Sequence, residues 1–564
     1  MTTKAGLLSG EAAKGPARSR LAPRLSERTL FALWVLVTVP VAAFIMGPSI
    51  PNGLVVDDFW WLWRLGPLHE PAWGLISGAS HYSPTIQLIL SEWYQHFGLD
   101  GAPYHVLSVA AYWLGAIAVA WLGWELTGNL FIGLAAGTGV LINHQPAQAY
   151  VWAVGIWYTF STIFYVIGFA GYLASIRSLD EKGKVGRGYC LYLAGLVLGI
   201  LTHEQGLTLV GVTLLHTVLL VDRVGARPLR ETWPMAKLLQ RVRFFALPTA
   251  LTVTAVVARL LVFRQNAAQI LPQFPYYEAW VSILRSFLPG LSRPLAIKLT
   301  LNLGARLGPE TTGQLILFLV QLAVLVIAFV LVERWYKFLL LWTAAQVVTL
   351  LYGLGFLFPR HYYLATVPSI LLWSSAGFAL FKWVNEQLEK RRVALKPLVL
   401  TALVGVVAFV FLLTQLPEHR AFQESWQVAT YTSTRTFQTL KRLADANPSA
   451  DKLVLLNLPD TLISSNREWI GVFNVGAAEA VQLYLPGRFK SVVLMRTPLD
   501  QYPAASSGLP PNLTQPHLPN LYYGAGEDVS FEEVSSLTLD PSNLVAYFNT
   551  SSMEIARVAP QAAR

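Results

Sequence analysis

Two adjacent acids, Asp57 and Asp58, follow the first long apolar run, and an aromatic cluster from Phe59 to Trp63 comes directly after them. Adjacent like charges beside an apolar surface raise the pKa of at least one carboxyl group, which suits a general base. The same residues also fit a solvated acid pair beside tryptophans that anchor a membrane surface. The dipeptide alone leaves both interpretations open.

Two further segments carry residue types that could bind an anion or move a proton. His203 and Glu204 lie in a short turn between apolar runs, with no Lys or Arg in the same turn. Ionisable groups at a membrane surface are functional candidates, although a plain polar turn explains them as well. Arg360 precedes Tyr362 and Tyr363, and a planar cation beside phenols matches what a phosphate requires. Interfacial anchoring is the alternative for this segment.

Smaller candidates lie near the ends of other apolar runs. They are Arg64, His81, Tyr82, His144, Arg259 and Arg264. No zinc-type Cys/His spacing, P-loop or dinucleotide fingerprint accompanies them, so a nucleotide-driven cytoplasmic reaction has no support in the sequence.

The composition indicates that lipid is the solvent for most of this chain. Of the 564 residues, 54% are hydrophobic and only 13% are charged, against about 25% charged in soluble domains. The net charge of +10 is spread between apolar runs and does not form one basic face for nucleic acid. The fold class expected is therefore an α-helical polytopic membrane protein.

Hydropathy predicts about eleven membrane spans. They are expected near 30–47, 104–123, 130–142, 152–175, 189–202, 206–221, 244–263, 312–332, 338–357, 361–381 and 397–414. With the N-terminus inside, the cytoplasmic segments hold 23 Lys and Arg and the outer loops hold 7. This asymmetry follows the positive-inside rule and places Asp57, Glu204 and Arg360 together on the outer face.

Three domains follow from this pattern. Residues 1–29 form a basic cytoplasmic segment and residues 30–414 the transmembrane domain. Residues 415–564 change to strand-like runs, such as Leu453 to Leu458 and Val492 to Met495, between Pro- and Gly-rich loops. We expect a small extracytoplasmic α/β domain there.

The order of these landmarks resembles the GT-C glycosyltransferases, in particular the branch of protein O-mannosyltransferases and their bacterial relatives. Asp57-Asp58 looks like the family's acid pair, and His81 to Pro84 like the Pro-containing segment after it. Asn143 to Ala147, leading into Val151 to Gly155, looks like the segment joining the family's third and fourth spans. The His203-Glu204 turn looks like the family's Lys-Glu turn, with His in place of Lys, and Arg360 to Leu364 like its late Arg-Tyr segment. The C-terminal region carries no such match.

The resemblance implies an inverting transfer of a sugar from a polyprenyl-phosphate donor to an acceptor hydroxyl at the outer membrane face. The catalytic residues implied are Asp57, Asp58 and Glu204, with Asp57 as the base. The residues implied for the donor phosphate are Arg360, His203, Tyr362 and Arg264. The residues implied for the acceptor are Arg64, His81, Tyr82 and His144.

No cofactor is required by this chemistry, and Asp57, Asp58 and Glu204 would hold a divalent cation, Mg²⁺ or Mn²⁺, if one takes part. The partners expected are the lipid-linked donor, membrane lipids and a glycan, lipid or protein acceptor, and no nucleic acid. Three alternatives are open: a ligase that moves a whole glycan from a lipid diphosphate, a non-enzymatic transporter of lipid or sugar, and a non-catalytic relative that uses its C-terminal region as a binding module. The expected location is the cytoplasmic membrane, with the N-terminus inside and the C-terminal domain outside.

Overall fold

The computed structural model describes fourteen stretches of the chain. They are 26–55, 57–65, 83–223, 234–262, 276–291 with 293 and 296, 334–354, 359–390, 397–459, 461–463, 469–473, 476–496, 521–522, 527–549 and 554–558. Most of this structure is helical, as the composition predicts.

Six helical segments in the described part of the chain are long and apolar enough to cross a membrane. They are Glu27–Ser49, Gly101–Thr127, Ala153–Lys182, Glu204–Val221, Met235–Ala258 and Tyr362–Leu388. Each corresponds to one of the predicted spans, while Leu130–Ile142 and Gly188–Thr202 are shorter apolar helices. The predicted span 312–332 lies outside the described residues. A multi-span helical membrane protein is therefore supported, and the count of eleven stays a prediction.

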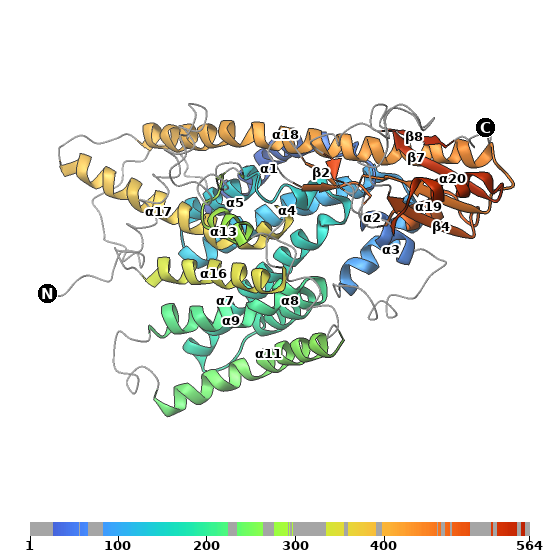
Figure 1. Ribbon diagram of the computed structural model, residues 1–564. Helices are drawn as coiled ribbons and strands as arrows, with labels where there is room; N and C mark the ends of the chain where they lie inside the picture. Colours follow the sequence, from blue (N-terminus) through green and yellow to red (C-terminus); the bar gives the residue numbers. More distant parts are fainter. Residues whose placement is uncertain are drawn as a thin grey trace.

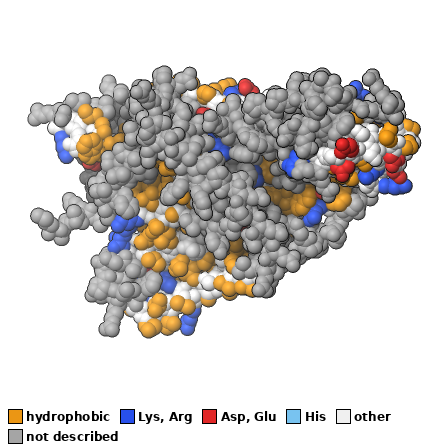
Figure 2. Space-filling view, viewed as in Figure 1, with side chains coloured by type: hydrophobic (Ala, Val, Ile, Leu, Met, Phe, Trp, Pro, Cys, Tyr) orange, Lys and Arg blue, Asp and Glu red, His pale blue; other side chains and the backbone are white. Residues whose placement is uncertain are grey.

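The membrane-type helices pack side by side in Figure 1. They are α1 (Glu27–Met46), α4 (Gly101–Thr127), α5 (Leu130–Ile142), α7 (Ile156–Lys182), α8 (Gly188–Thr202), α9 (Thr208–His216) with the π-helical turn η5 (Thr217–Val221), α11 (Met235–Val262), α16 (Arg334–Leu354) and α17 (Tyr362–Lys390). Hydrophobic side chains gather on the face where α9 and α11 lie (Figure 2). The exposed apolar side chains of α11 include Leu239, Val242 and Val253. A lipid environment accounts for apolar exposure of this extent.

Glycines bring α7 and α8 into close contact. A Cβ built on Gly195 would lie 2.4 Å from the Cα of Gly168, and one on Gly188 would lie 2.7 Å from the carbonyl oxygen of Gly171. Small residues allow backbones to approach in this way, and membrane helices depend on such packing because lipid removes the hydrophobic driving force between them.

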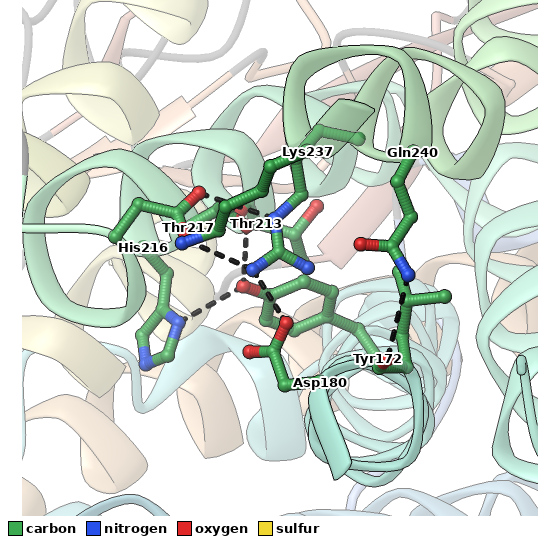
Figure 3. Close-up of polar contacts among 10 residues, drawn as sticks. Tyr172, Asp180, Thr213, His216, Thr217, Lys237 and Gln240 are labelled. Atoms are coloured by element: carbon green, nitrogen blue, oxygen red, sulfur yellow. Dashed lines mark hydrogen bonds and ion pairs between the residues drawn. The ribbon is translucent and has the colours of Figure 1, made fainter. Parts of the chain in front are cut away.

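Ion pairs join the ends of α7, η5 and α11 (Figure 3). The Asp222 carboxylate, whose side chain is fully buried, accepts hydrogen bonds from Arg241 Nε at 3.1 Å and Nη2 at 2.9 Å and lies 2.7 Å from Lys237 Nζ. Arg241 also pairs with Asp180 of α7 at 2.7 Å. The Tyr172 hydroxyl nearby contacts His216 Nδ1 at 3.0 Å. These contacts fix three helices at one end of the bundle.

The stretch predicted as one outer loop, 48–103, contains two helices. These are α2 (Asp57–Leu65) and α3 (Pro84–Phe97), after a 3₁₀ turn η1 (Gly47–Ser49). Asp57 is the first residue of α2, and its side chain lies outside the described residues. The acid pair therefore stands at a helix start, not in an irregular loop.

Helix α18 (Pro397–Asp445) is much longer than the predicted span 397–414 and continues through residue 415, where the soluble domain was expected to begin. Beyond residue 414 it buries residues three or four positions apart, including Gln415, His419, Gln423 and Trp426. Polar side chains on this buried face hid the helical period from hydropathy. Figure 1 shows α18 running along the upper edge of the molecule to the strands.

Beyond α18, five strands form a sheet in the order β6-β4-β1-β7-β8. β1 (Lys452–Leu456) pairs in parallel with β4 (Ser491–Arg496) and β7 (Asn543–Asn549), with Leu453 opposite Val492 and Leu544. β6 (Glu527–Asp528) is parallel to β4, and β8 (Glu554–Arg557) antiparallel to β7. Helix α19 (Ala477–Tyr484) precedes β4 in the chain, and helix α20 (Phe531–Leu539) precedes β7. A second, antiparallel sheet consists of β2 (Thr461–Ile463), β3 (Trp469–Gly471) and β5 (Leu521–Tyr522). The two predicted strands are β1 and β4.

Candidate functional site

A short irregular segment between α5 and α7 is the centre of the polar contacts. It consists of α6 (Gln148–Val151), Trp152 and the 3₁₀ turn η3 (Ala153–Gly155), and its residues are buried. A Cβ on Gly155 would lie 2.7 Å from the Gln148 carbonyl oxygen, so the segment folds tightly back on itself. Tyr158 follows in the first turn of α7.

Arg360, in the 3₁₀ turn η6 (Pro359–His361), lies against this segment. Its Nε donates to the Tyr158 hydroxyl at 3.2 Å, and its Nη1 donates to Gln148 Oε1 at 3.1 Å. The guanidinium also lies 4.8 Å from the centre of the Trp152 ring. These three contacts orient the planar cation, which is half-buried. A guanidinium held this way is suited to bind a phosphate in a fixed orientation.

The His203-Glu204 turn meets the same tyrosine. The His203 ring, buried to 1% exposure, lies 4.7 Å from the Tyr158 ring. His203 Nδ1 accepts from the Gln205 backbone at 3.2 Å, which leaves Nε2 facing Glu204 Oε2 at 3.8 Å. The Gln205 amide donates to the His361 carbonyl at 3.4 Å. Two motifs 156 residues apart in sequence are thereby joined.

The acid helix α2 also contacts this segment. Asp58 Oδ1 accepts from the Val154 backbone at 3.1 Å, and Oδ2 accepts from the Val55 backbone at 2.9 Å. The Trp61 ring packs edge-on at 4.7 Å against Trp157, the neighbour of Tyr158. Asp58 is buried to 1% exposure, so these contacts make it a residue that ties α2 to η3. Asp57 is thereby held at the start of the same helix.

Tyr362, predicted at the phosphate, is buried at the start of α17. The guanidinium of Arg285, on α13 (Tyr276–Phe287), lies 5.0 Å from its ring centre. Arg285 is itself only 2% exposed. The predicted outer loop 264–311 therefore brings a buried arginine against the ring of Tyr362, two residues after Arg360.

Other predicted residues make contacts of a different kind or cannot be placed. His144 is 5% exposed and its Nδ1 donates to Gln415 Oε1 at 2.7 Å, a contact that joins the turn after α5 to α18. Arg64 stacks on Trp60 of its own helix at 4.1 Å. The side chains of His81, Tyr82 and Arg264 lie outside the described residues, as does that of Arg259.

The described residues contain no group of three His, Cys, Asp or Glu side chains that could hold a metal ion. Asp58 and Glu204 are among these residues, whereas the Asp57 side chain lies outside them. The divalent cation stays a prediction.

Two residues of this arrangement, Gln148 and Tyr158, carried no motif in the sequence, and Trp152 lay in the matched stretch Val151 to Gly155 without an assigned role. Each lies in an apolar run where an aromatic or amide residue is common. Their position near the junction of the predicted spans 130–142 and 152–175 is the only sequence signal that could have identified them as site residues.

Comparisons with known proteins gave one kind of match. No family model matches the chain, and no curated protein matches it. Among solved structures, the chain is similar to ArnT from Cupriavidus metallidurans bound to undecaprenyl phosphate, with 12% identity and a TM-score of 0.42 over 93% of this chain and 94% of that one. It is also similar to the apo state of ArnT, with 13% identity and a TM-score of 0.38 over 84% and 86% of the two chains.

Proposed function

We propose that this chain is a glycosyltransferase that moves a sugar from a polyprenyl-phosphate donor to an acceptor hydroxyl at the outer face of the cytoplasmic membrane. One observation carries the proposal: the segment 148–158 gathers three predicted motifs that are far apart in the sequence. Asp58 accepts a hydrogen bond from its backbone, the His203 ring lies 4.7 Å from the Tyr158 ring, and Arg360 donates to Gln148 and Tyr158.

In the proposed reaction the acceptor oxygen attacks the sugar C1 while the bond from C1 to the phosphate oxygen breaks. The acceptor's proton passes to Asp57, and the bonding electron pair leaves with the lipid phosphate. Arg360 stabilises the negative charge that develops on the phosphate. Because a phosphate leaves as an anion, a strong general acid is unnecessary, which suits one base opposite an arginine.

The neighbouring groups have supporting roles in this scheme. Asp58 holds α2 against η3 through the Val154 contact. His203 lies beside Tyr158 and would add charge near the phosphate when protonated, with Glu204 Oε2 3.8 Å from its Nε2. Glu204 is then the candidate for binding the acceptor or a divalent cation. The apolar helix surfaces would hold the lipid tail.

Arg285 favours a second candidate, the transfer of a whole glycan from a lipid diphosphate. A donor with two phosphates needs more than one cation, and Arg285 reaches the Tyr362 ring beside the Arg360 turn. No described contact favours a transporter in the same way.

A donor panel separates these functions. The purified full chain in lipid nanodiscs would receive labelled polyprenyl-monophosphate sugars or polyprenyl-diphosphate glycans, with envelope extract as the acceptor source. We expect release of polyprenyl monophosphate together with labelled acceptor. Release of polyprenyl diphosphate, with labelled acceptor formed from the diphosphate donors alone, would favour the ligase. Movement of the lipid across a vesicle bilayer without bond cleavage would favour the transporter.

A further inference from the structure

We infer that Phe437 of α18 and Tyr484 of α19 are positioning residues for the acid pair. Their rings pack against Phe59 and thereby fix helix α2 against the segment 148–158, to which Arg360 donates its hydrogen bonds. This inference rests on the proposed function for its catalytic meaning. It assigns to the C-terminal part of the chain, expected as a separate domain, a role within the transfer site.

The contact begins at Phe59, the residue after Asp58. Phe59 is 1% exposed, and its ring meets the Phe437 ring edge-on at 5.4 Å and the Tyr484 ring at 5.9 Å. Phe437 and Tyr484 stack on each other at 4.9 Å with an angle of 11° between their planes. The Phe473 ring meets the Phe437 ring edge-on at 5.9 Å. Aromatic rings in these geometries attract each other beyond simple burial.

Helix geometry places α2 between two bodies. Successive residues of an α-helix are about 100° apart around its axis, so Phe59 and Trp61 point to roughly opposite sides. Phe59 faces α18 and α19, whereas Trp61 packs on Trp157 of α7. Asp58, between them, is bound to Val154. Helix α2 can therefore shift toward or away from the segment 148–158 only if the Phe59 contact on one side or the Trp61 and Asp58 contacts on the other are lost.

The chain that leads into α2 is also held by α18. Gln427 donates to the Pro48 carbonyl at 3.0 Å, and Gln423 donates to the Ile45 carbonyl at 2.7 Å. A Cβ on Gly53 would lie only 2.9 Å from Thr434 Oγ1. The second half of α18 therefore contacts the chain at several points from the end of α1 to the start of α2.

A fixed α2 matters because transfer depends on the distance between base, acceptor oxygen and sugar C1. A displacement of about 1 Å can lower a rate by about a hundredfold. Loss of the Phe437 or Tyr484 ring should therefore reduce turnover while the phosphate contacts of Arg360 stay in place.

The test compares Phe437→Leu and Tyr484→Leu with Tyr547→Leu in the full chain. Tyr547 is also buried, but it packs with Val454 and Val534 in the separate cluster of buried residues that α20 helps to form. Tyr547→Leu therefore removes a tyrosine ring from the C-terminal sheet and leaves the contacts of α2 unchanged. Tyr484→Phe keeps the ring and serves as the conservative rescue.

Two measurements are made on each variant. Hydrogen exchange of the backbone amides of residues 57–65 reports the mobility of α2 without any activity. Sugar transfer under saturating and limiting donor gives kcat and KM separately. We expect faster exchange in α2 and a fall in kcat of about 10- to 100-fold for Phe437→Leu and Tyr484→Leu, with donor KM unchanged. Tyr547→Leu and Tyr484→Phe should leave α2 exchange as in the unaltered chain.

Unchanged exchange in Phe437→Leu, or equally faster exchange in Tyr547→Leu, would overturn the inference, since the rings would then only stabilise the fold. If the unaltered chain transfers no sugar, the proposed function fails, and the exchange data still decide whether these rings hold α2.

Discussion

Tyr158 is the residue through which the polar groups of the site meet. Its hydroxyl accepts from Arg360, and its ring lies beside those of His203 at 4.7 Å and His361 at 5.3 Å. One rigid phenol thus sets the spacing between a guanidinium and two imidazoles. At the scale of single residues, the proposal predicts that the positive charge and hydrogen bonds of Arg360 contribute more to binding of the donor phosphate than the packing of its side chain.

Arg360→Ala should weaken binding of polyprenyl phosphate by about 1.5–3 kcal/mol, because it removes hydrogen bonds from a charged donor. Arg360→Lys should recover only part of this, since an ammonium lacks the planar fork. Lipid phosphate binding to the purified chain in nanodiscs measures both. Arg177→Ala is the matched control, because Arg177 pairs with Glu125 about 28 Å along the same helix α7 from Tyr158. Equal affinity in Arg360→Ala and Arg177→Ala would make Arg360 an anchor.

Local residue types predicted Arg360, His203 and the acid pair, because each stands in a polar break between apolar runs. They could not predict the roles of Asp58 and His144. Asp58 accepts from a backbone amide 96 positions away, and His144 donates to Gln415, 271 positions away. Contacts over such separations leave no local pattern.

At the scale of elements, the helices meet through small residues and through ion pairs at their ends. Hydropathy predicted where most helices lie, since apolar runs in lipid must be helical. It ended α18 at residue 414 because polar residues then begin, although these face the interior and continue the helical period to Asp445.

Gly195→Ala should destabilise the bundle by about 1–3 kcal/mol, the typical cost of overpacking. The new Cβ would meet the Gly168 backbone at 2.4 Å, and backbone cannot move aside as a flexible side chain can. Gly211→Ala is the control, since nothing lies within 4 Å of its Cβ position. Chemical denaturation in mixed micelles compares the two. A Gly195→Ala protein as stable as Gly211→Ala would contradict the close packing of α7 and α8.

Asp222→Ala should cost about 3–5 kcal/mol, because it leaves Arg241 and Lys237 without the buried carboxylate that pairs with both. Glu125→Ala removes an acid from an exposed pair, with side chains 39% and 54% exposed, and should cost under about 1 kcal/mol. The same denaturation experiment measures both variants. Similar losses for the two would show that the cluster in Figure 3 contributes no more than a surface pair.

At the scale of the whole molecule, the proposal depends on one orientation. The segments with most Lys and Arg alternate with the loops that carry Asp57, Glu204 and Arg360, and this pattern predicts that these three residues lie on the outer face. Two of the C-terminal strands, β1 and β4, could be predicted from their strand-like runs, whereas the packing of α19 on α2 through Tyr484 could not.

Cysteine labelling tests this orientation. In a Cys190→Ser background, Glu479→Cys on α19 should react with a membrane-impermeant reagent in intact cells. Lys184→Cys, between α7 and α8, should react only after permeabilisation. Labelling of both positions from the same side would mean that the predicted number of spans between them is wrong by an odd number, and the outer-face assignment would fail.

The most direct test of the central claim is sugar transfer by Asp57→Asn in the donor-panel assay. The substitution keeps the size of the side chain and removes the base, so transfer should fall by about 10²–10⁴. The variant should still fold and should bind polyprenyl phosphate as the unaltered chain does. A variant that transfers sugar at the normal rate would contradict the account, because Asp57 and Asp58 would then be only a polar pair beside tryptophans.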